Sequence, residues 1–129
     1  MTPGKVFTES DLAQDSINYD TYHSWDHHSS YSALSPSKML LGMNRDIVTA
    51  HENLKTAKVL FVTLGTARVH LLKSSNQVVS NCHKQPSYMF EKVLLSVNDV
   101  VATLKESLLL CRKHNPNIKV GHSIARIVL

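Results

Sequence analysis

KVLFVTLGTARVHLLKSSNQVVSNCHK, residues 58–84, is the stretch from which the architecture of the chain can be worked out. It opens with an unbroken apolar run at residues 59–62, which is too short for a helix and has valine at both ends. We therefore expect a strand that is buried on both faces. The run is followed by Gly65, where the absence of a Cβ lets the backbone turn sharply or lie close to a ligand. Open α/β sheets place their sites at the carboxyl ends of such strands.

The elements around this run follow from local signals. Residues 67–73 and 77–79 are separated by a polar break, which favours a hairpin-like turn. Ser35-Pro36 is typical of a helix start, and Ser96 of a second one. The predicted helices cover residues 36–57 and the stretch from Ser96 to His114, with buried faces formed by apolar residues three and four apart: Met39, Leu40, Met43, Ile47, Ala50 and Leu54, and then Val97, Val100, Val101, Leu104, Leu108 and Cys111.

The second helix leads to another predicted strand. Asn115-Pro116 ends the helix, and residues 118–120 alternate apolar and charged side chains. A strand, a helix and a strand in succession indicate a right-handed crossover between parallel strands. Residues 1–36 show little periodicity, apart from one helical turn predicted at residues 7–12 with Thr8 as its cap.

Composition bounds the class of protein. The chain has 129 residues, of which 43% are hydrophobic, which suits one domain with a modest core. Its net charge of +4 comes from scattered lysine and arginine, so no nucleic-acid partner is expected. Two cysteines do not make a disulfide framework, and no apolar run approaches the ~20 residues of a membrane span. No signal peptide is recognisable, and the localisation stays open, with the cytoplasm as the default.

Several separated motifs resemble one family. LGTARVH (residues 64–70), SNCHKQPSYMFEKVLLSV (80–97), HSWDHHSSYSA (23–33) and NPNIKV (115–120) are similar, in order, to motifs of the GSCFA domain family. The resemblance covers about residues 7–120 and is lost over residues 121–129. It implies a partial three-layer α/β/α fold, SGNH-hydrolase-like (flavodoxin-like), with parallel central strands. It also implies descent from an esterase that hydrolyses acyl groups with a serine nucleophile.

The first candidate site is the turn after the central strand. The backbone N–H groups of Gly65 and Thr66, or the Thr66 hydroxyl, are candidates to bind an oxyanion, and the resemblance sets both residues at the edge of a site. The alternative is a turn glycine followed by a capping threonine. The asparagine that the SGNH pattern carries just after this glycine is missing here.

The second candidate is the NCHK motif. Asn81, His83 and Lys84 are predicted to line a polar pocket for a carbonyl group or a sugar. Cys82 and His83 are neighbours on an extended segment and point to opposite sides, so we do not expect an activated thiolate pair. Cys82 is interpreted as a small buried residue.

The third candidate is the histidine-rich loop. His23, Asp26, His27 and His28 have the spacing of metal ligands, but a loop shows no convergence, and solvated or capping histidines are favoured. By the resemblance we keep pocket roles for His23, Trp25, His27 and His28. No cofactor and no resident metal are expected.

The family's catalytic motifs are not found. The chain has no Gly-Ser-Cys-Phe-Ala stretch and, after residue 120, no Asp-x-x-His element, and no role is transferred to His122 or Ser123. We expect an internal piece of a GSCFA-domain protein that is not catalytically competent by itself, the parent acting on an ester, an acylated small molecule or a glycan. The alternative is a non-enzymatic interaction or metal-binding module using the histidine-rich loop, with self-association through an exposed sheet edge.

Overall fold

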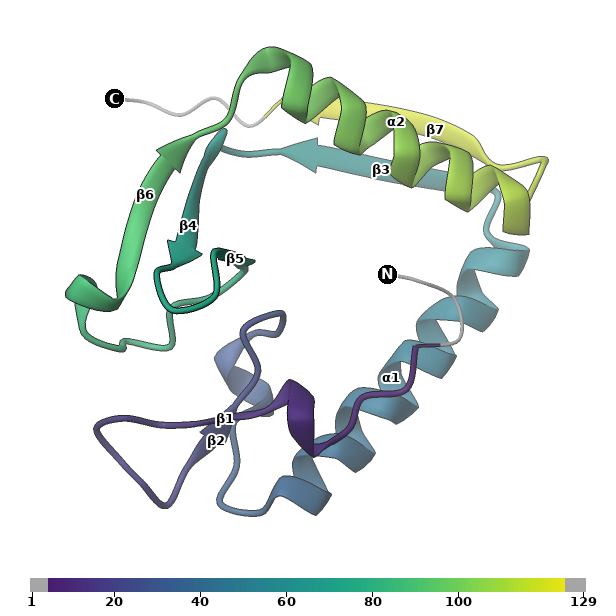
Figure 1. Ribbon diagram of the computed structural model, residues 1–129. Coiled ribbons are helices and arrows are strands. Elements are labelled where there is room, and N and C mark those ends of the chain that lie inside the picture. The colour runs from purple at the N-terminus through teal and green to yellow at the C-terminus, as the bar shows by residue number, and fades with distance from the viewer. Residues whose placement is uncertain (1–4, 125–129) are drawn as a thin grey trace. The chain divides into compact units, whose positions relative to one another are not determined.

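The protein is described by a computed structural model that covers residues 5–124 (Figure 1). Within this range the chain forms two compact units. The first unit contains residues 5–49 and 69–93, and the second unit contains residues 50–68 and 94–124. The single domain of residues 1–129 stays a prediction. No helix in the described range is long and apolar enough to cross a membrane.

The elements alternate between helical and extended segments, so the mixed α/β class is confirmed. Three short 3-10 turns interrupt the order: η1 (Glu9–Asp11), η2 (Ser29–Tyr31) and η3 (Ser87–Met89). The two helices are α1 (Pro36–Thr56) and α2 (Val97–His114). The strands are β1 (Ala13–Gln14), β2 (Tyr22–His23), β3 (Val59–Leu64), β4 (Arg68–Leu72), β5 (Gln77–Val79), β6 (Phe90–Leu94) and β7 (Lys119–Ile124).

The N-terminal segment of the first unit has more structure than its sequence suggests. Thr8 precedes η1 and its N–H donates to the Asp11 carboxylate at 2.9 Å, so the predicted capped turn is confirmed. β1 and β2 then pair antiparallel. Asn44 of α1 holds this segment, because its side chain accepts from the Phe7 N–H at 2.7 Å and donates to the Phe7 carbonyl at 3.0 Å. These bonds place Phe7 in a core with Met39 and Met43.

The predicted hairpin forms the second core of the first unit. β4 and β5 pair antiparallel, and β6 lies on the other side of β4. The turn between β4 and β5 needs a left-handed residue, which Asn76 supplies with a φ of 55°, because asparagine tolerates this conformation better than most residues. Leu72, Val79 and Phe90 are buried together beneath this sheet.

The second unit is built on the predicted parallel pair. β3 and β7 pair in parallel register from Val59 opposite Lys119 to Leu64 opposite Ile124. α2 precedes β7, and Ser96 caps it by accepting the Asp99 N–H at 3.1 Å while its own N–H donates to the Asp99 carboxylate. The predicted parallel pairing is therefore confirmed, but the strand directly before α2, β6, pairs with β4, so β7 returns beside β3 rather than beside the strand that precedes the helix.

The burial predicted for β3 is wrong. Its residues alternate between exposed and half-buried, and Phe61 is 77% exposed. Phe61 also fills the space above Gly121, where a Cβ on the glycine would lie 2.9 Å from the ring. The parallel sheet of the described residues has only two strands, so it buries one face of β3 rather than two.

The predicted apolar faces of the helices are correct in part. Met39 and Met43 of α1 are buried, whereas Ala50 is exposed. On the predicted face of α2, Val97 and Val101 are 78% and 55% exposed, and the other predicted positions are half-buried. A helix that covers a two-stranded sheet meets too little apolar surface to bury its whole stripe.

Candidate functional site

Two segments far apart in the sequence meet inside the first unit. The Ser80 N–H donates to the Trp25 carbonyl at 2.8 Å, and His83 Nε2 donates to the Ser24 carbonyl at 2.8 Å. The histidine-rich loop and the NCHK motif, which the sequence marks separately, are thus parts of one site. We call His23, Ser24, Trp25, His27 and His83 the histidine cluster.

The backbone at His83 is unusual. His83 and Lys84 have φ values of 49° and 59°, so two consecutive non-glycine residues are left-handed. Each such residue costs on the order of 1–3 kcal/mol, and it persists only where neighbouring contacts hold it. Asn81 supplies one of them, because its side-chain oxygen accepts the His83 N–H at 2.8 Å. Gln85 supplies two further contacts. Its backbone N–H donates to the Cys82 carbonyl, and its side-chain amide donates to the His83 carbonyl.

The two imidazole rings of His23 and His83 lie face to face. Their centroids are 4.5 Å apart with an interplanar angle of 21°. His23 is 1% exposed and His83 9%. Both ring nitrogens of His23 and Nδ1 of His83 are buried without a hydrogen-bond partner among the described residues, which is rare for buried polar atoms.

Burial determines the charge of His23. It lowers the pKa of His23 from 6.5 to about 4, since a buried imidazolium loses its hydration. The neighbouring His83 lowers this pKa further, and the carboxylate of Asp15 opposes the shift. His23 is therefore neutral at neutral pH.

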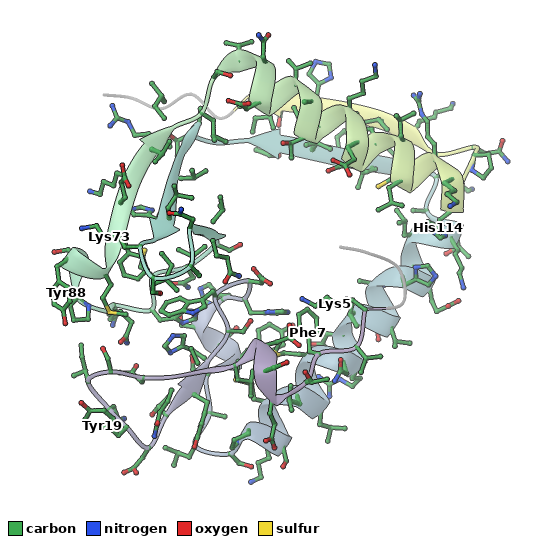
Figure 2. The ribbon with its side chains drawn as sticks, viewed as in Figure 1. Lys5, Phe7, Tyr19, Lys73, Tyr88 and His114 are labelled. Carbon is green, nitrogen blue, oxygen red and sulfur yellow. The ribbon has the colours of Figure 1, made fainter. Side chains whose placement is uncertain are left out.

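Trp25 joins the cluster to the core beneath the hairpin. Its ring meets the His23 ring edge-on at 4.4 Å between centroids and the Phe90 ring at 5.8 Å. Figure 2 draws the side chains of the first unit, including those of the histidine-rich loop and the NCHK motif. The site is consequently a packed interior of aromatic and imidazole rings.

Ser24 is a member of the cluster that the sequence analysis missed. It is 1% exposed, and its hydroxyl lies 3.1 Å from Nδ1 of His27. Burial also lowers the pKa of His27, and the tautomer of this ring decides whether Nδ1 accepts from the Ser24 hydroxyl or donates to it. The signal in the sequence was the Ser-x-x-His spacing, since a turn brings residues three apart together, and the His27 N–H does donate to the Ser24 carbonyl.

The remaining predicted residues lie elsewhere. Lys84 is exposed, and His28 caps η2 by accepting the Ser30 N–H at 3.1 Å. Asp26 is exposed and 3.9 Å from the Lys5 ammonium. Gly65 and Thr66 belong to the second unit, where the Thr66 hydroxyl accepts the Arg68 N–H at 3.1 Å, as a capping threonine does.

Metal and thiol chemistry find little support in the geometry. No group of three or more His, Cys, Asp or Glu side chains within residues 5–124 is placed to hold a metal ion. Burial raises the pKa of the Cys82 thiol, and the side chain packs against the core beneath the hairpin. Cys82 is therefore half-buried rather than buried as predicted, and its raised pKa disfavours a thiolate nucleophile.

The geometry fixes one tautomer in the cluster. His83 donates from Nε2 to a carbonyl, so the neutral ring carries its lone pair on Nδ1. An imidazole held in this form can accept a proton or a hydrogen bond. The hydroxyl of Ser24, in contrast, is buried and already bonded, so it is not presented to a substrate.

Comparison with known proteins identifies one family. The model of the GSCFA family matches residues 2–124. No curated protein and no solved structure matches the chain.

Proposed function

Because the chain belongs to the GSCFA family, we propose that it serves in esterase-type hydrolysis of acyl groups, as the part built around the histidine cluster. The observation that supports this is the buried His83, which combines a left-handed backbone with an unpartnered ring nitrogen. Strained residues and unsatisfied buried titratable groups concentrate at functional sites.

In this proposal the cluster positions groups and does not attack the substrate. Acyl hydrolysis by a serine enzyme needs an exposed hydroxyl, an imidazole that takes its proton and donors for the oxyanion. Ser24 is unsuited as the nucleophile because its side chain is buried and its hydroxyl is already hydrogen-bonded to His27. The Gly-Ser-Cys-Phe-Ala stretch that names the family is not among these residues. We therefore expect no ester turnover by the chain alone.

An esterase assay tests this proposal in two arms. The purified chain with p-nitrophenyl acetate and butyrate should show only the unsaturable rate of exposed imidazoles. Saturable turnover that is lost in His83→Gln and kept in His28→Gln, whose ring is exposed, would contradict it. A family member that also carries the Gly-Ser-Cys-Phe-Ala stretch should hydrolyse such esters, with kcat lowered about 100-fold when the histidine matching His83 becomes Gln. Absence of turnover there would refute the acyl-hydrolase proposal.

A second candidate function is self-association through the parallel sheet. β3 and β7 pair only with each other among the described residues, and Phe61 is 77% exposed on β3. Parallel strands are ordinarily covered on both faces, and open edges favour pairing with an identical edge. The proposed partner is a second copy of the same chain.

Light scattering after size exclusion tests the second candidate. The mass should rise from one copy to two with concentration, and Phe61→Glu should shift the midpoint at least tenfold, since burying an aromatic ring contributes ~2 kcal/mol. Leu41→Glu is the matched control, because Leu41 is exposed to a similar extent on α1. A single-copy mass at every concentration would rule this candidate out.

A further inference from the structure

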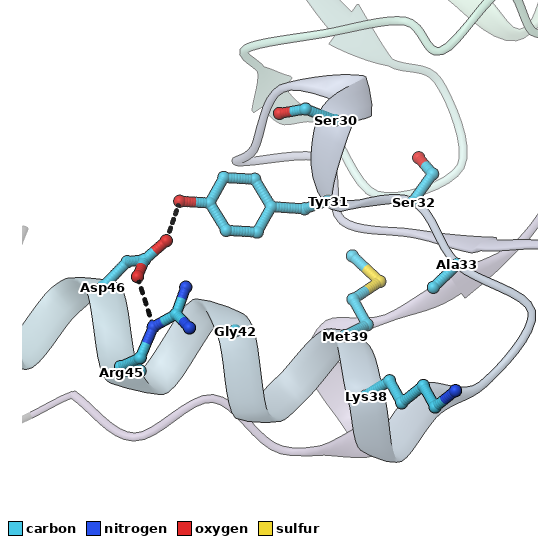
Figure 3. Close-up of a pocket in the computed structure, with 9 residues that line it drawn as sticks. All are labelled: Ser30, Tyr31, Ser32, Ala33, Lys38, Met39, Gly42, Arg45 and Asp46. Carbon is cyan, nitrogen blue, oxygen red and sulfur yellow. Dashed lines mark hydrogen bonds and ion pairs between the residues drawn. The ribbon is translucent and has the colours of Figure 1, made fainter.

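A hollow in the first unit lies apart from the histidine cluster. Figure 3 shows it between the turn η2 and the first half of α1. Its volume is about 430 Å³, within the range of sites for small molecules. It is lined by Ser30, Tyr31, Ser32, Ala33, Lys38, Met39, Gly42, Arg45 and Asp46, none of them in the cluster.

Gly42 keeps the hollow open. A glycine inside a helix is less favourable than alanine by ~1 kcal/mol. A Cβ at this position would meet only Tyr31 Cδ1, at 4.0 Å, which is an ordinary contact. Packing within the described residues therefore does not require a glycine here. What the missing side chain provides is room beside Tyr31.

The polar wall of the hollow is already organised. Asp46 accepts the Tyr31 hydroxyl proton at 2.7 Å on one oxygen and the Arg45 Nε–H at 2.9 Å on the other (Figure 3). Both carboxylate oxygens are thus engaged. The terminal amino groups of Arg45 have no hydrogen-bond partner among residues 5–124, and its side chain is 73% exposed. Asp46 therefore holds the Nε edge of the Arg45 guanidinium, and the two terminal amino groups at the opposite edge remain as parallel donors.

Apart from Lys38, the rest of the wall is apolar or uncharged. Met39 is 3% exposed and contributes its thioether side chain, next to the Tyr31 ring and Ala33. In Figure 3 the ammonium of Lys38 points away from Arg45, so the guanidinium is the cation beside Gly42. The hollow therefore combines the guanidinium of Arg45 with the apolar surface of Met39 and the ring of Tyr31.

We propose that this hollow binds a small organic anion, a carboxylate or a phosphate monoester attached to an apolar group. The anionic oxygens pair with the two terminal amino groups of Arg45, which match their spacing. The apolar group occupies the space above Gly42 and lies against Met39 and Tyr31. The volume admits a ligand of one ring and its substituents.

A titration followed by two-dimensional ¹H–¹⁵N NMR tests the proposal. The probes are benzoate, phenyl phosphate and the uncharged benzyl alcohol, each up to about 20 mM, a range that covers millimolar dissociation constants. Benzoate or phenyl phosphate should shift amides of residues 30–33 and 38–46 along saturating curves, whereas benzyl alcohol should not. Binding of one anion but not the other supports the proposal and identifies the head group.

Three variants separate recognition from folding. Arg45→Gln and Gly42→Leu should each raise Kd at least about tenfold, the first by removing the fork and the second by filling the hollow. Gly42→Ala should keep the binding and raise Tm, because only a methyl group enters. Arg112→Gln, an exposed arginine in the last turn of α2, is the charge control and should leave Kd unchanged.

The outcomes that overturn the proposal are distinct. No saturating shift with either anion refutes it, as do equal shifts with benzyl alcohol. Shifts spread over basic residues of both units and weakened equally by Arg112→Gln would show unspecific charge attraction instead. Retained binding in Gly42→Leu would show that the anion lies outside the hollow.

Discussion

Lowering the pH from about 7.5 to about 4.5 should remove roughly 2–3 kcal/mol of the free energy of unfolding through His23 alone. The pKa of His23 is about 4 in the folded chain and 6.5 when unfolded. Between these values the unfolded state binds the proton and the folded state does not. Stability is therefore full above pH 6.5 and falls continuously as the pH approaches 4.

Neighbouring titratable groups set the limits of this window. Burial lowers the pKa of His27, which adds in the same direction. The charge of Asp15 acts on His23, and hydrogen bonds lower the pKa of Asp15 from 3.8, so its own contribution is lost only at more acidic pH. The same holds for Asp11. A measurement above about pH 4.5 consequently reports the histidines.

Trp25 provides the measurement, since it is the single tryptophan and its ring touches His23. Urea unfolding is followed by its fluorescence at intervals of about one pH unit. In His23→Phe an aromatic ring still stacks against His83 but cannot bind a proton, so the dependence of stability on pH should become much flatter. His28→Gln removes an exposed histidine and should preserve it. A flat profile for the unsubstituted chain would contradict the burial of an unpartnered His23.

The second large effect is expected at Asn115 in the second unit. Asn115 is 7% exposed, and its amide donates to the carbonyls of Leu54 and Ala57, both at 2.8 Å. These carbonyls lie at the C-terminal end of α1, where helix carbonyls lack partners of their own. Asn115→Asp keeps the shape but turns two donors into a carboxylate facing two carbonyl oxygens. We expect a loss of about 3 kcal/mol at neutral pH.

Hydrogen exchange and circular dichroism measure this loss. The signal at 222 nm should melt at lower temperature in Asn115→Asp, and exchange should accelerate in residues 97–118. Part of the stability should return in acid, because the protonated carboxyl can donate to one carbonyl again. Asn117→Asp, at an exposed position two residues further on, should change little. Equal stability of both variants would show that the amide bridges contribute nothing.

Local signals were sufficient for most of the fold. Ser35-Pro36 and Ser96 mark the helix starts because caps act within one turn. The order of the elements indicated a parallel pair across α2, but not that β7 pairs with β3 while β6 joins another sheet. The burial of β3 was not predictable, since a run such as residues 59–62 has no alternation to show which face is covered. Tertiary context alone decides that Phe61 is exposed.

The site was predictable as a set of residues rather than as an arrangement. Motif resemblance marked His23, Trp25 and His83, which the structure brings together. Nothing in the motifs distinguishes these from Lys84 and His28, whose side chains are exposed. For His83 and Lys84 the distinction depends on the left-handed turn that hydrogen bonds to Asn81 and Gln85 accompany, whereas His28 is exposed where it caps η2.

The aromatic ring of Phe61 over Gly121 constrains how this sequence can diverge. The two residues are direct neighbours in the register of β3 and β7, and a Cβ at position 121 would require the ring to move. Each position therefore sets the size allowed at the other. Relatives that carry a side chain at position 121 should carry a smaller residue than phenylalanine at position 61. The two positions are therefore expected to covary across lineages, even though Phe61 is exposed and Gly121 has no side chain.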